Sequence, residues 1–89
     1  MLEREVTISN KLGMHLRAAA VFIETGNKFQ CQIYLRKGSR QVNAKSIMGL
    51  MTLGAACGAV VTITTDGEDE HEAMEALVAL VNNKFGEKE

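Results

Sequence analysis

The sequence predicts an α+β fold in two layers, an open-faced sandwich in which helices cover one side of a sheet. Four short segments alternate apolar and polar residues or are rich in β-branched residues, which is typical of half-buried strands. Three further segments repeat apolar residues at helical spacing, so each has one face to bury. The order strand–helix–strand–strand–helix–strand–helix favours two layers and leaves the order of the strands open.

The N-terminal third contains the first strand and the first helix. Residues 4–9 alternate, with Val6 and Ile8 on one face, and are predicted to form a strand. A helix is expected over residues 16–28, ending near Gly26. Its inner face is expected to carry the residues at helical spacing, with Phe22 on a flank: Leu16, Ala19, Ala20 and Ile23.

The middle of the chain is expected to contain a hairpin. Residues 32–37 alternate again and form a strand with Ile33 and Leu35 pointing inward. The glycine-containing turn at residues 37–40 then leads into a short strand over residues 41–44.

A short helix over residues 47–53 is expected between Ser46, which can act as its N-cap, and Gly54, which closes it. This helix is apolar on more than one side, whereas a helix in a two-layer fold buries one stripe. We therefore expect Met48 and Met51 to be exposed, because flexible methionines on a surface suit docking to several partners. The alternative is a helix that is buried all round. A serine at the cap is also a place where an added phosphate would sit well.

The last strand and helix complete the predicted fold. Residues 59–65 are β-branched and alternate, so they predict a strand. Asp69 is expected to cap the final helix, and Glu72 completes a capping-box pattern three residues later. The apolar stripe of this helix comprises Met74, Leu77, Val78, Val81 and Phe85.

Length, composition and the N-terminus indicate one domain over residues 1–89, expected in the cytoplasm. The longest uncharged stretch, residues 46–65, is interrupted by polar residues and glycines, so no membrane span is expected. Residues 1–5 contain acids and no apolar segment, unlike a secretory signal.

The charge is unevenly distributed although the formal net charge is −1. Residues 1–45 carry eight basic and three acidic side chains, and residues 46–89 carry two basic and eight acidic ones. The two halves either pack together and partly cancel, or present a basic face to an acidic partner or a phosphate. Three Phe, one Tyr and no Trp argue against a nucleic-acid-binding module.

The two cysteines, Cys31 and Cys57, lack the spacing of a metal site or a redox pair. We expect both to be free and partly buried thiols.

Residues 13–17 are the strongest candidate for chemistry. Gly13 is a turn residue that delivers His15 to the start of a helix, where free backbone N–H groups favour anions. The same field favours the neutral, nucleophilic imidazole over the imidazolium ion. Arg17 is placed to hold the oxygens of a phosphoryl group on that ring. By itself the motif is also compatible with a histidine that merely caps the helix.

Two separated segments give the chain a family resemblance. Residues 10–17 read Asn-Lys-Leu-Gly-Met-His-Leu-Arg, and residues 42–55 surround Ser46. Both closely resemble the HPr family, the histidine phosphocarriers of the bacterial phosphoenolpyruvate-dependent phosphotransferase system, and the resemblance covers essentially the full length. It implies an antiparallel four-stranded sheet ordered 1-4-2-3, with three helices on one face.

The resemblance also implies roles for individual residues. His15 corresponds to the residue phosphorylated on Nδ1 by enzyme I, and Arg17 to the arginine that supports the phosphate. Ser46 corresponds to the serine modified by an HPr kinase/phosphorylase. Ile47, Met48 and Met51 correspond to the patch that docks partners, which are expected to include IIA-type domains. Leu16, beside the histidine, is expected to contact partners as well. Such a chain is a monomeric, stoichiometric carrier rather than an enzyme, and it needs no metal or cofactor and binds neither nucleic acid nor membrane.

The chain departs from the family pattern directly after the histidine. The family usually has His-Ala-Arg-Pro, whereas this chain has His15-Leu16-Arg17-Ala18. Ala18 restores a backbone donor that proline lacks, and Leu16 adds apolar bulk. These departures leave open a nitrogen-branch or purely regulatory HPr-like protein that acts through Ser46. A small nucleic-acid-binding or metal-binding module is the remaining alternative.

Overall fold

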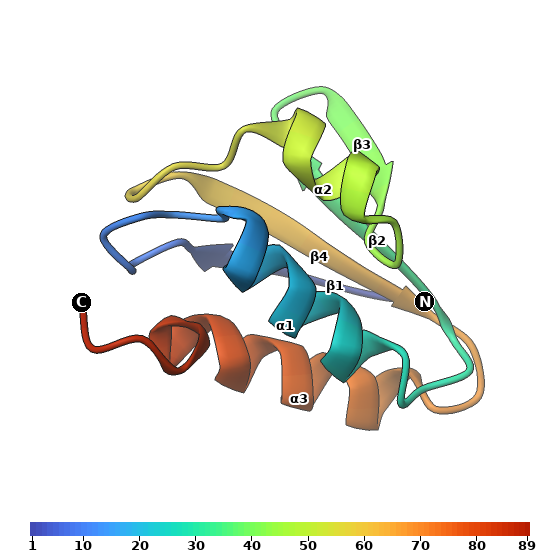
Figure 1. The fold of residues 1–89 in the computed structure, drawn as a ribbon. Coiled ribbons are helices and arrows are strands. Elements are labelled where there is room, and N and C mark those ends of the chain that lie inside the picture. The colour runs from blue at the N-terminus through green and yellow to red at the C-terminus, as the bar shows by residue number, and fades with distance from the viewer.

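The computed structural model describes residues 1–89 and has two layers, with three helices on one face of a four-stranded sheet (Figure 1). The strands are β1 (Leu2–Thr7), β2 (Gln32–Lys37), β3 (Arg40–Asn43) and β4 (Val60–Asp66). The helices are α1 (Leu16–Gly26), α2 (Ile47–Leu53) and α3 (Glu70–Asn82), followed by the 3₁₀ turn η1 (Lys84–Gly86). The predicted α+β open-faced sandwich is confirmed.

All neighbouring strands are antiparallel, in the order β1-β4-β2-β3. β4 is central, and its Thr65 lies opposite Leu2 of β1 and Ile33 of β2. The first strand begins and ends two residues earlier than expected, yet Ile8 still joins the core because its N–H donates to the carbonyl of Ala59 at 2.9 Å.

The core lies between the sheet and the helices. The strands contribute alternate residues, as period-two patterns require. The largest apolar side chains with less than 2% exposure are Ile8, Phe22, Ile33, Leu35, Leu50, Val61, Ile63, Leu77 and Val81. Phe85 is also buried, but it lies beyond α3, in η1, rather than in the helix that was expected to carry it.

The predicted inner face of α1 is right for Ala19, which is buried, and for Ile23, which packs partly buried against the core, and it is wrong for the other two residues. Leu16 is 64% exposed and Ala20 is exposed, whereas Ala18, Ala19 and Phe22 are buried. The segment carries two overlapping apolar stripes, and the helix buries the one led by the large aromatic ring, which removes more apolar surface from water. Leu16 is therefore left on the surface beside His15.

The predicted cap of α2 is confirmed, and that of α3 is corrected. The N–H of Gly49 donates to the Ser46 hydroxyl at 3.2 Å, and Gly54 ends α2 in a left-handed conformation. Asp69 stands at the N-cap of α3, but its carboxylate makes no bond to that helix.

The carboxylate of Asp69 instead fastens the loop between α1 and β2. It accepts hydrogen bonds from the backbone N–H groups of Gln30 at 2.8 Å and Cys31 at 2.9 Å. The pKa of Asp69 lies below its usual range, and the largest cause is the hydrogen bond from the Gln30 N–H. Glu70, rather than Glu72, accepts a backbone N–H in this turn, that of Gly67.

Both cysteines are free, but only Cys31 is buried; Cys57 is exposed, contrary to expectation. None of the helices has both the length and the apolar character needed to cross a membrane.

Substitutions on α1 test which face of this helix is buried. Phe22→Ala is expected to lower the free energy of unfolding by about 3–5 kcal/mol, because it removes a fully buried ring. Leu16→Ala is expected to change it by less than about 0.5 kcal/mol. Urea unfolding of the two variants measures both values, and a large loss for Leu16→Ala would contradict the observed face.

Candidate functional site

The site is built around His15, which stands at the N-cap of α1 and projects from the loop that leads into the helix. Its backbone carbonyl accepts the Ala19 N–H at 2.9 Å, and no side chain caps the helix. The first N–H groups of α1 therefore have no partner within the helix and favour an anion at this end.

The loop before His15 rests directly on another backbone segment. Gly13 has φ +67°, and a Cβ there would lie 2.8 Å from both the Ala55 carbonyl oxygen and the Ala56 Cα. The N–H of Met14 donates to the same Ala55 carbonyl at 2.8 Å. Only glycine satisfies both the conformation and the close approach, so this contact fixes where the histidine emerges.

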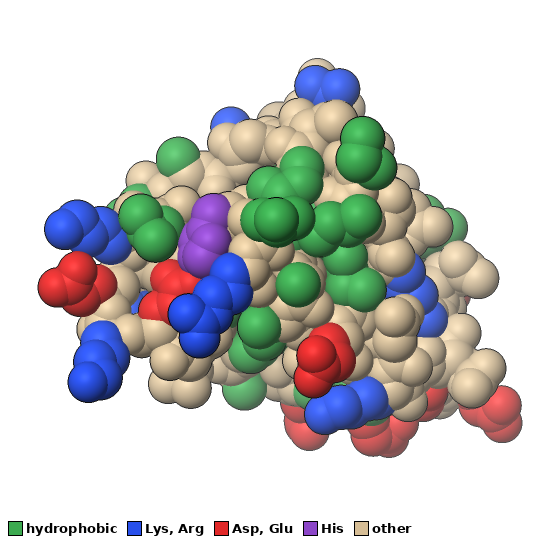
Figure 2. Space-filling model, viewed as in Figure 1, with side chains coloured by type: hydrophobic (Ala, Val, Ile, Leu, Met, Phe, Trp, Pro, Cys, Tyr) green, Lys and Arg blue, Asp and Glu red, His purple; other side chains and the backbone are tan.

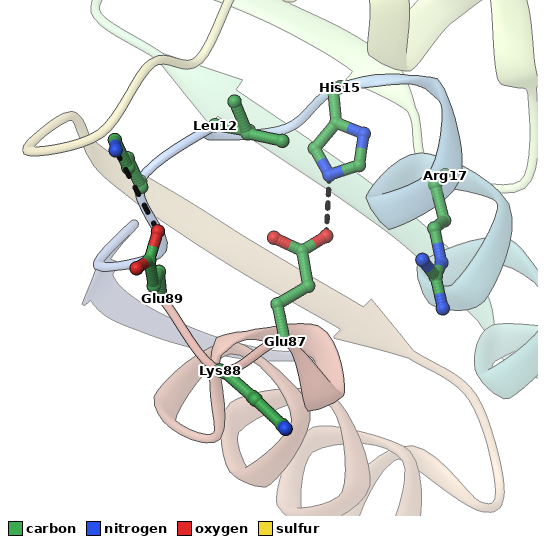
Figure 3. A pocket seen from close by; sticks show the side chains of 7 residues that line it. Leu12, His15, Arg17, Glu87, Lys88 and Glu89 are labelled. Atoms are coloured by element: carbon green, nitrogen blue, oxygen red, sulfur yellow. Dashed lines mark hydrogen bonds and ion pairs between the residues drawn. The ribbon is translucent and has the colours of Figure 1, made fainter.

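The C-terminal tail supplies an unexpected partner for the histidine. Oε2 of Glu87 lies 2.5 Å from Nε2 of His15, and the other carboxylate oxygen accepts the side-chain N–H of Asn10 at 3.0 Å (Figure 3). The tail runs beside the same loop, since the Lys11 N–H donates to the Glu89 carbonyl at 2.6 Å. Carboxylate and imidazole thus form a pair drawn from opposite ends of the chain.

Asn10 links this pair to the loop before α1. It is fully buried, and its Nδ2 also donates to the Gly13 carbonyl at 2.7 Å. Both of its contacts are acceptors, so the amide nitrogen must face them. Its Oδ1 has no partner, and such a buried orphan costs about 1–3 kcal/mol. The contribution of Asn10 to the site therefore consists of the two hydrogen bonds that it donates, to the Gly13 carbonyl and to Glu87.

The pocket around the histidine is rich in charge. Its seven lining residues are Lys11, Leu12, His15, Arg17, Glu87, Lys88 and Glu89. The pKa of Glu87 lies below its usual value, mainly because Asn10 donates a hydrogen bond to the carboxylate and secondly because His15 does. Glu87 is thus ionised at neutral pH and can only accept hydrogen bonds. Three cationic side chains outnumber the two carboxylates of this lining, which leaves the pocket suited to an anion even though Lys11 lies 3.7 Å from the Glu89 carboxylate.

An apolar patch adjoins the pocket. Figure 2 shows hydrophobic side chains gathered beside the histidine on this face. We call the docking patch the set Leu12, Leu16, Ile47, Met48 and Met51. Leu12, Leu16 and Met48 are 68%, 64% and 72% exposed. Ile47 and Met51 are partly buried against the core, so the expected exposure holds fully for Met48 only.

Ser46 lies at the edge of the docking patch rather than in the pocket. It is partly buried, and its hydroxyl is occupied by the Gly49 N–H. The structure therefore brings His15 and Arg17 together in one pocket and leaves Ser46 outside it, next to Ile47 and Met48.

Sequence reasoning missed Glu87 and the bonding role of Asn10. Asn10 belongs to the segment that carried the family resemblance, but nothing in its spacing showed which groups it would contact. Glu87 is 72 positions from His15 and gave no signal, because only the fold brings the two together. No group of three or more His, Cys, Asp and Glu side chains is arranged to hold a metal ion.

Comparison with known proteins decides the family. The model of the PTS HPr component phosphorylation site matches residues 2–83. The chain belongs to the HPr family. HPr proteins are phosphocarriers of the phosphotransferase system, and the resemblance seen in the sequence is thereby confirmed.

Individual HPr relatives match along the whole chain. The phosphocarrier protein HPr of Cupriavidus necator is 53% identical over 89 residues and is covered completely, as is this chain. An HPr crystal structure from Thermoanaerobacter tengcongensis has a TM-score of 0.96 at 49% identity, with 100% of both chains covered. The HPr-like protein Crh of Halalkalibacterium halodurans is 44% identical over 84 residues, covering 94% of this chain and 100% of the relative.

The carboxyl of Glu87 should titrate below its ordinary value of 4.5, because two side chains donate hydrogen bonds to its charged form. The contact then stabilises the fold above the pKa of the unfolded chain and is lost as pH falls through the folded value. Carbon-detected NMR titration measures the midpoint.

Two variants sharpen this titration. Asn10→Ala should raise the midpoint most and His15→Ala less, in the order of their contributions. A midpoint at or above 4.5 in the parent protein would contradict the hydrogen-bonded arrangement.

Proposed function

We propose that this chain is a phosphoryl carrier that accepts phosphate from enzyme I on His15 and passes it to IIA-type domains. The observation that supports the proposal most directly is a histidine at an uncapped helix N-terminus, in a pocket where three cationic side chains outnumber two carboxylates. Family membership supports the same role. The whole chain, residues 1–89, would act as one cytoplasmic carrier domain and as a monomer.

The pocket can do what a carrier requires. The ring of His15 supplies the nucleophile, and the free N–H groups at the start of α1 face the place where phosphoryl oxygens would lie. Arg17 lines the same pocket and can pair with those oxygens. The chain itself holds the phosphate and is regenerated only when the group leaves, so it acts as a stoichiometric carrier rather than an enzyme.

The docking patch supports transfer between proteins. Direct transfer requires the donor and acceptor atoms to meet with water excluded, and the exposed apolar side chains beside His15 can form such a contact surface. Leu16, where the family usually has alanine, widens the patch at the edge of the pocket. We propose that partners contact Leu16, Ile47, Met48 and Met51, and that Leu16 favours partners with a matching hollow.

We further propose that Ser46 regulates docking rather than chemistry. Phosphorylation by an HPr kinase/phosphorylase would add about −1.5 to −2 charges next to Ile47 and Met48. Charge at this point opposes the dehydration of the docking patch, so partner binding would weaken while the pocket of His15 stays intact.

A second candidate is a regulatory or nitrogen-branch HPr-like protein gated by Ser46. Its support is the departure at Leu16 and Ala18 together with the likeness to relatives named HPr-like protein Crh. Rapid and reversible transfer from the chain to a IIA domain would exclude a purely regulatory role.

Incubation with enzyme I and phosphoenolpyruvate tests the carrier function. Intact mass is expected to show one acid-labile phosphate on the parent protein and none on His15→Ala. Phosphate that persists in His15→Ala would contradict the assignment. No phosphate on the parent, with an enzyme I that is active on another HPr, would favour the second candidate.

Ser46→Asp is expected to slow phosphoryl transfer from enzyme I by about tenfold, equivalent to about 1.4 kcal/mol, because it places charge beside the docking patch. Ser39→Asp is the matched control, since it introduces the same charge at an exposed position in the hairpin turn between β2 and β3. Rapid quench-flow assays measure the transfer rates of both variants. Equal slowing by the two substitutions would show that total charge matters and position does not.

A further inference from the structure

We propose that Glu87 is the positioning residue of His15: its carboxylate holds the hydrogen on Nε2 and so leaves Nδ1 as the free nucleophilic nitrogen. The inference rests on the proposed function for its kinetic consequence, but its structural part concerns the resting protein alone.

The hydrogen-bond inventory of the contact fixes the tautomer. An ionised carboxylate has no hydrogen to donate, and Oε2 of Glu87 lies 2.5 Å from Nε2 of His15. The ring nitrogen must therefore be the donor. A neutral imidazole carries one N–H, so its other nitrogen, Nδ1, keeps a lone pair. Figure 3 shows that second nitrogen on the side of the ring turned away from Glu87.

The carboxylate is itself held in place. Asn10 donates to its other oxygen at 3.0 Å while bonding the Gly13 carbonyl of the loop that carries His15. The Glu87 side chain is only 17% exposed and that of His15 27% exposed. A carboxylate fixed on both oxygens orients the ring, as the outer partners of ligating or catalytic histidines do.

The chain before Glu87 is bent to bring it there. Lys84, Phe85 and Gly86 follow one another with φ values of 57°, 56° and 81°. Two successive non-glycine residues in this region are strained, and such strain persists only where surrounding contacts maintain it. Here Phe85 is buried in the core on one side of the bend, and Glu87 is bonded to Asn10 and His15 on the other.

Glu87 can stay bonded to Nε2 of His15 throughout the transfer of the phosphoryl group. The Nδ1 lone pair forms a bond to phosphorus as the bond between phosphorus and the donor atom of enzyme I breaks, and the donor atom keeps that electron pair. The hydrogen on Nε2 stays in place, and positive charge develops on the ring of His15. The Glu87 carboxylate stabilises that charge at close range, and the nearby cations Lys11, Arg17 and Lys88 face the pocket that receives the phosphoryl oxygens.

Glu87→Gln tests the inference with a directional outcome. The amide oxygen of the new side chain is expected to keep the bond from Asn10, which turns its NH₂ group toward Nε2. The ring must then accept at Nε2 and carry its hydrogen on Nδ1. Long-range ¹H–¹⁵N NMR of the histidines, at a pH where the rings are neutral, should show the Nε2–H form in the parent and the Nδ1–H form in Glu87→Gln.

Phosphorylation rates provide the second readout. Glu87→Gln is expected to slow phosphorylation of His15 by about 10- to 100-fold, and Glu87→Ala by less, because alanine frees the ring without imposing the wrong tautomer. Glu75→Gln is the control, since it makes the same change in charge on an exposed position of α3 outside the pocket. If Glu87 had only a structural role, the glutamine variant would not be phosphorylated more slowly than the alanine variant.

The outcomes separate this inference from the carrier function. If the parent accepts phosphate but the tautomer and rate are unchanged in Glu87→Gln, the positioning role is overturned and the carrier function stands. If the tautomer switches as expected and no form of the protein accepts phosphate, the positioning role stands and the carrier function fails.

Discussion

The close approach of Gly13 to the backbone of Ala55 and Ala56 is the constraint on which the site depends. There is no space for a side chain at this contact, and the backbone of residue 13 is left-handed. The approach lets Met14 bond the Ala55 carbonyl and sets the direction in which α1 begins. That direction sets the place of His15 at the helix end and its entry into the pocket, where the C-terminal tail reaches it.

The site joins three parts of the fold with different tasks. The loop before α1 carries His15, the tail after α3 carries the carboxylate bonded to it, and α2 carries three of the five residues of the docking patch. Under the proposed function, this separation would let Ser46 regulate the docking patch without disturbing the pocket. It also allows the patch to vary, as at Leu16, while the geometry of His15 is kept.

The sequence predicted the elements well because their patterns are local. Alternation identified all four strands, and Ser46 and Gly54 marked both ends of α2. The inner face of α1 was predicted only in part because two apolar stripes compete in that segment, and only packing against the sheet selects the one with Phe22. Asp69 was assigned to the wrong partners because the loop that needs its carboxylate is almost forty positions away.

The same distinction applies to the site. His15 and Arg17 lie within one short motif and were predicted from it, whereas Glu87 enters the site only through the bend at residues 84–86. Two successive left-handed residues without glycine cannot be foreseen from local preference, because the strain is maintained by the buried ring of Phe85 and by the bonds that Glu87 makes.

The most direct measurement is to identify the nitrogen that carries the phosphate. After phosphorylation of ¹⁵N-histidine-labelled protein, NMR coupling between phosphorus and nitrogen assigns the bond. The account predicts phosphate on Nδ1 of His15, with the hydrogen still on Nε2. Phosphate on Nε2 would contradict it, because Glu87 would then have to leave the very atom it is inferred to hold.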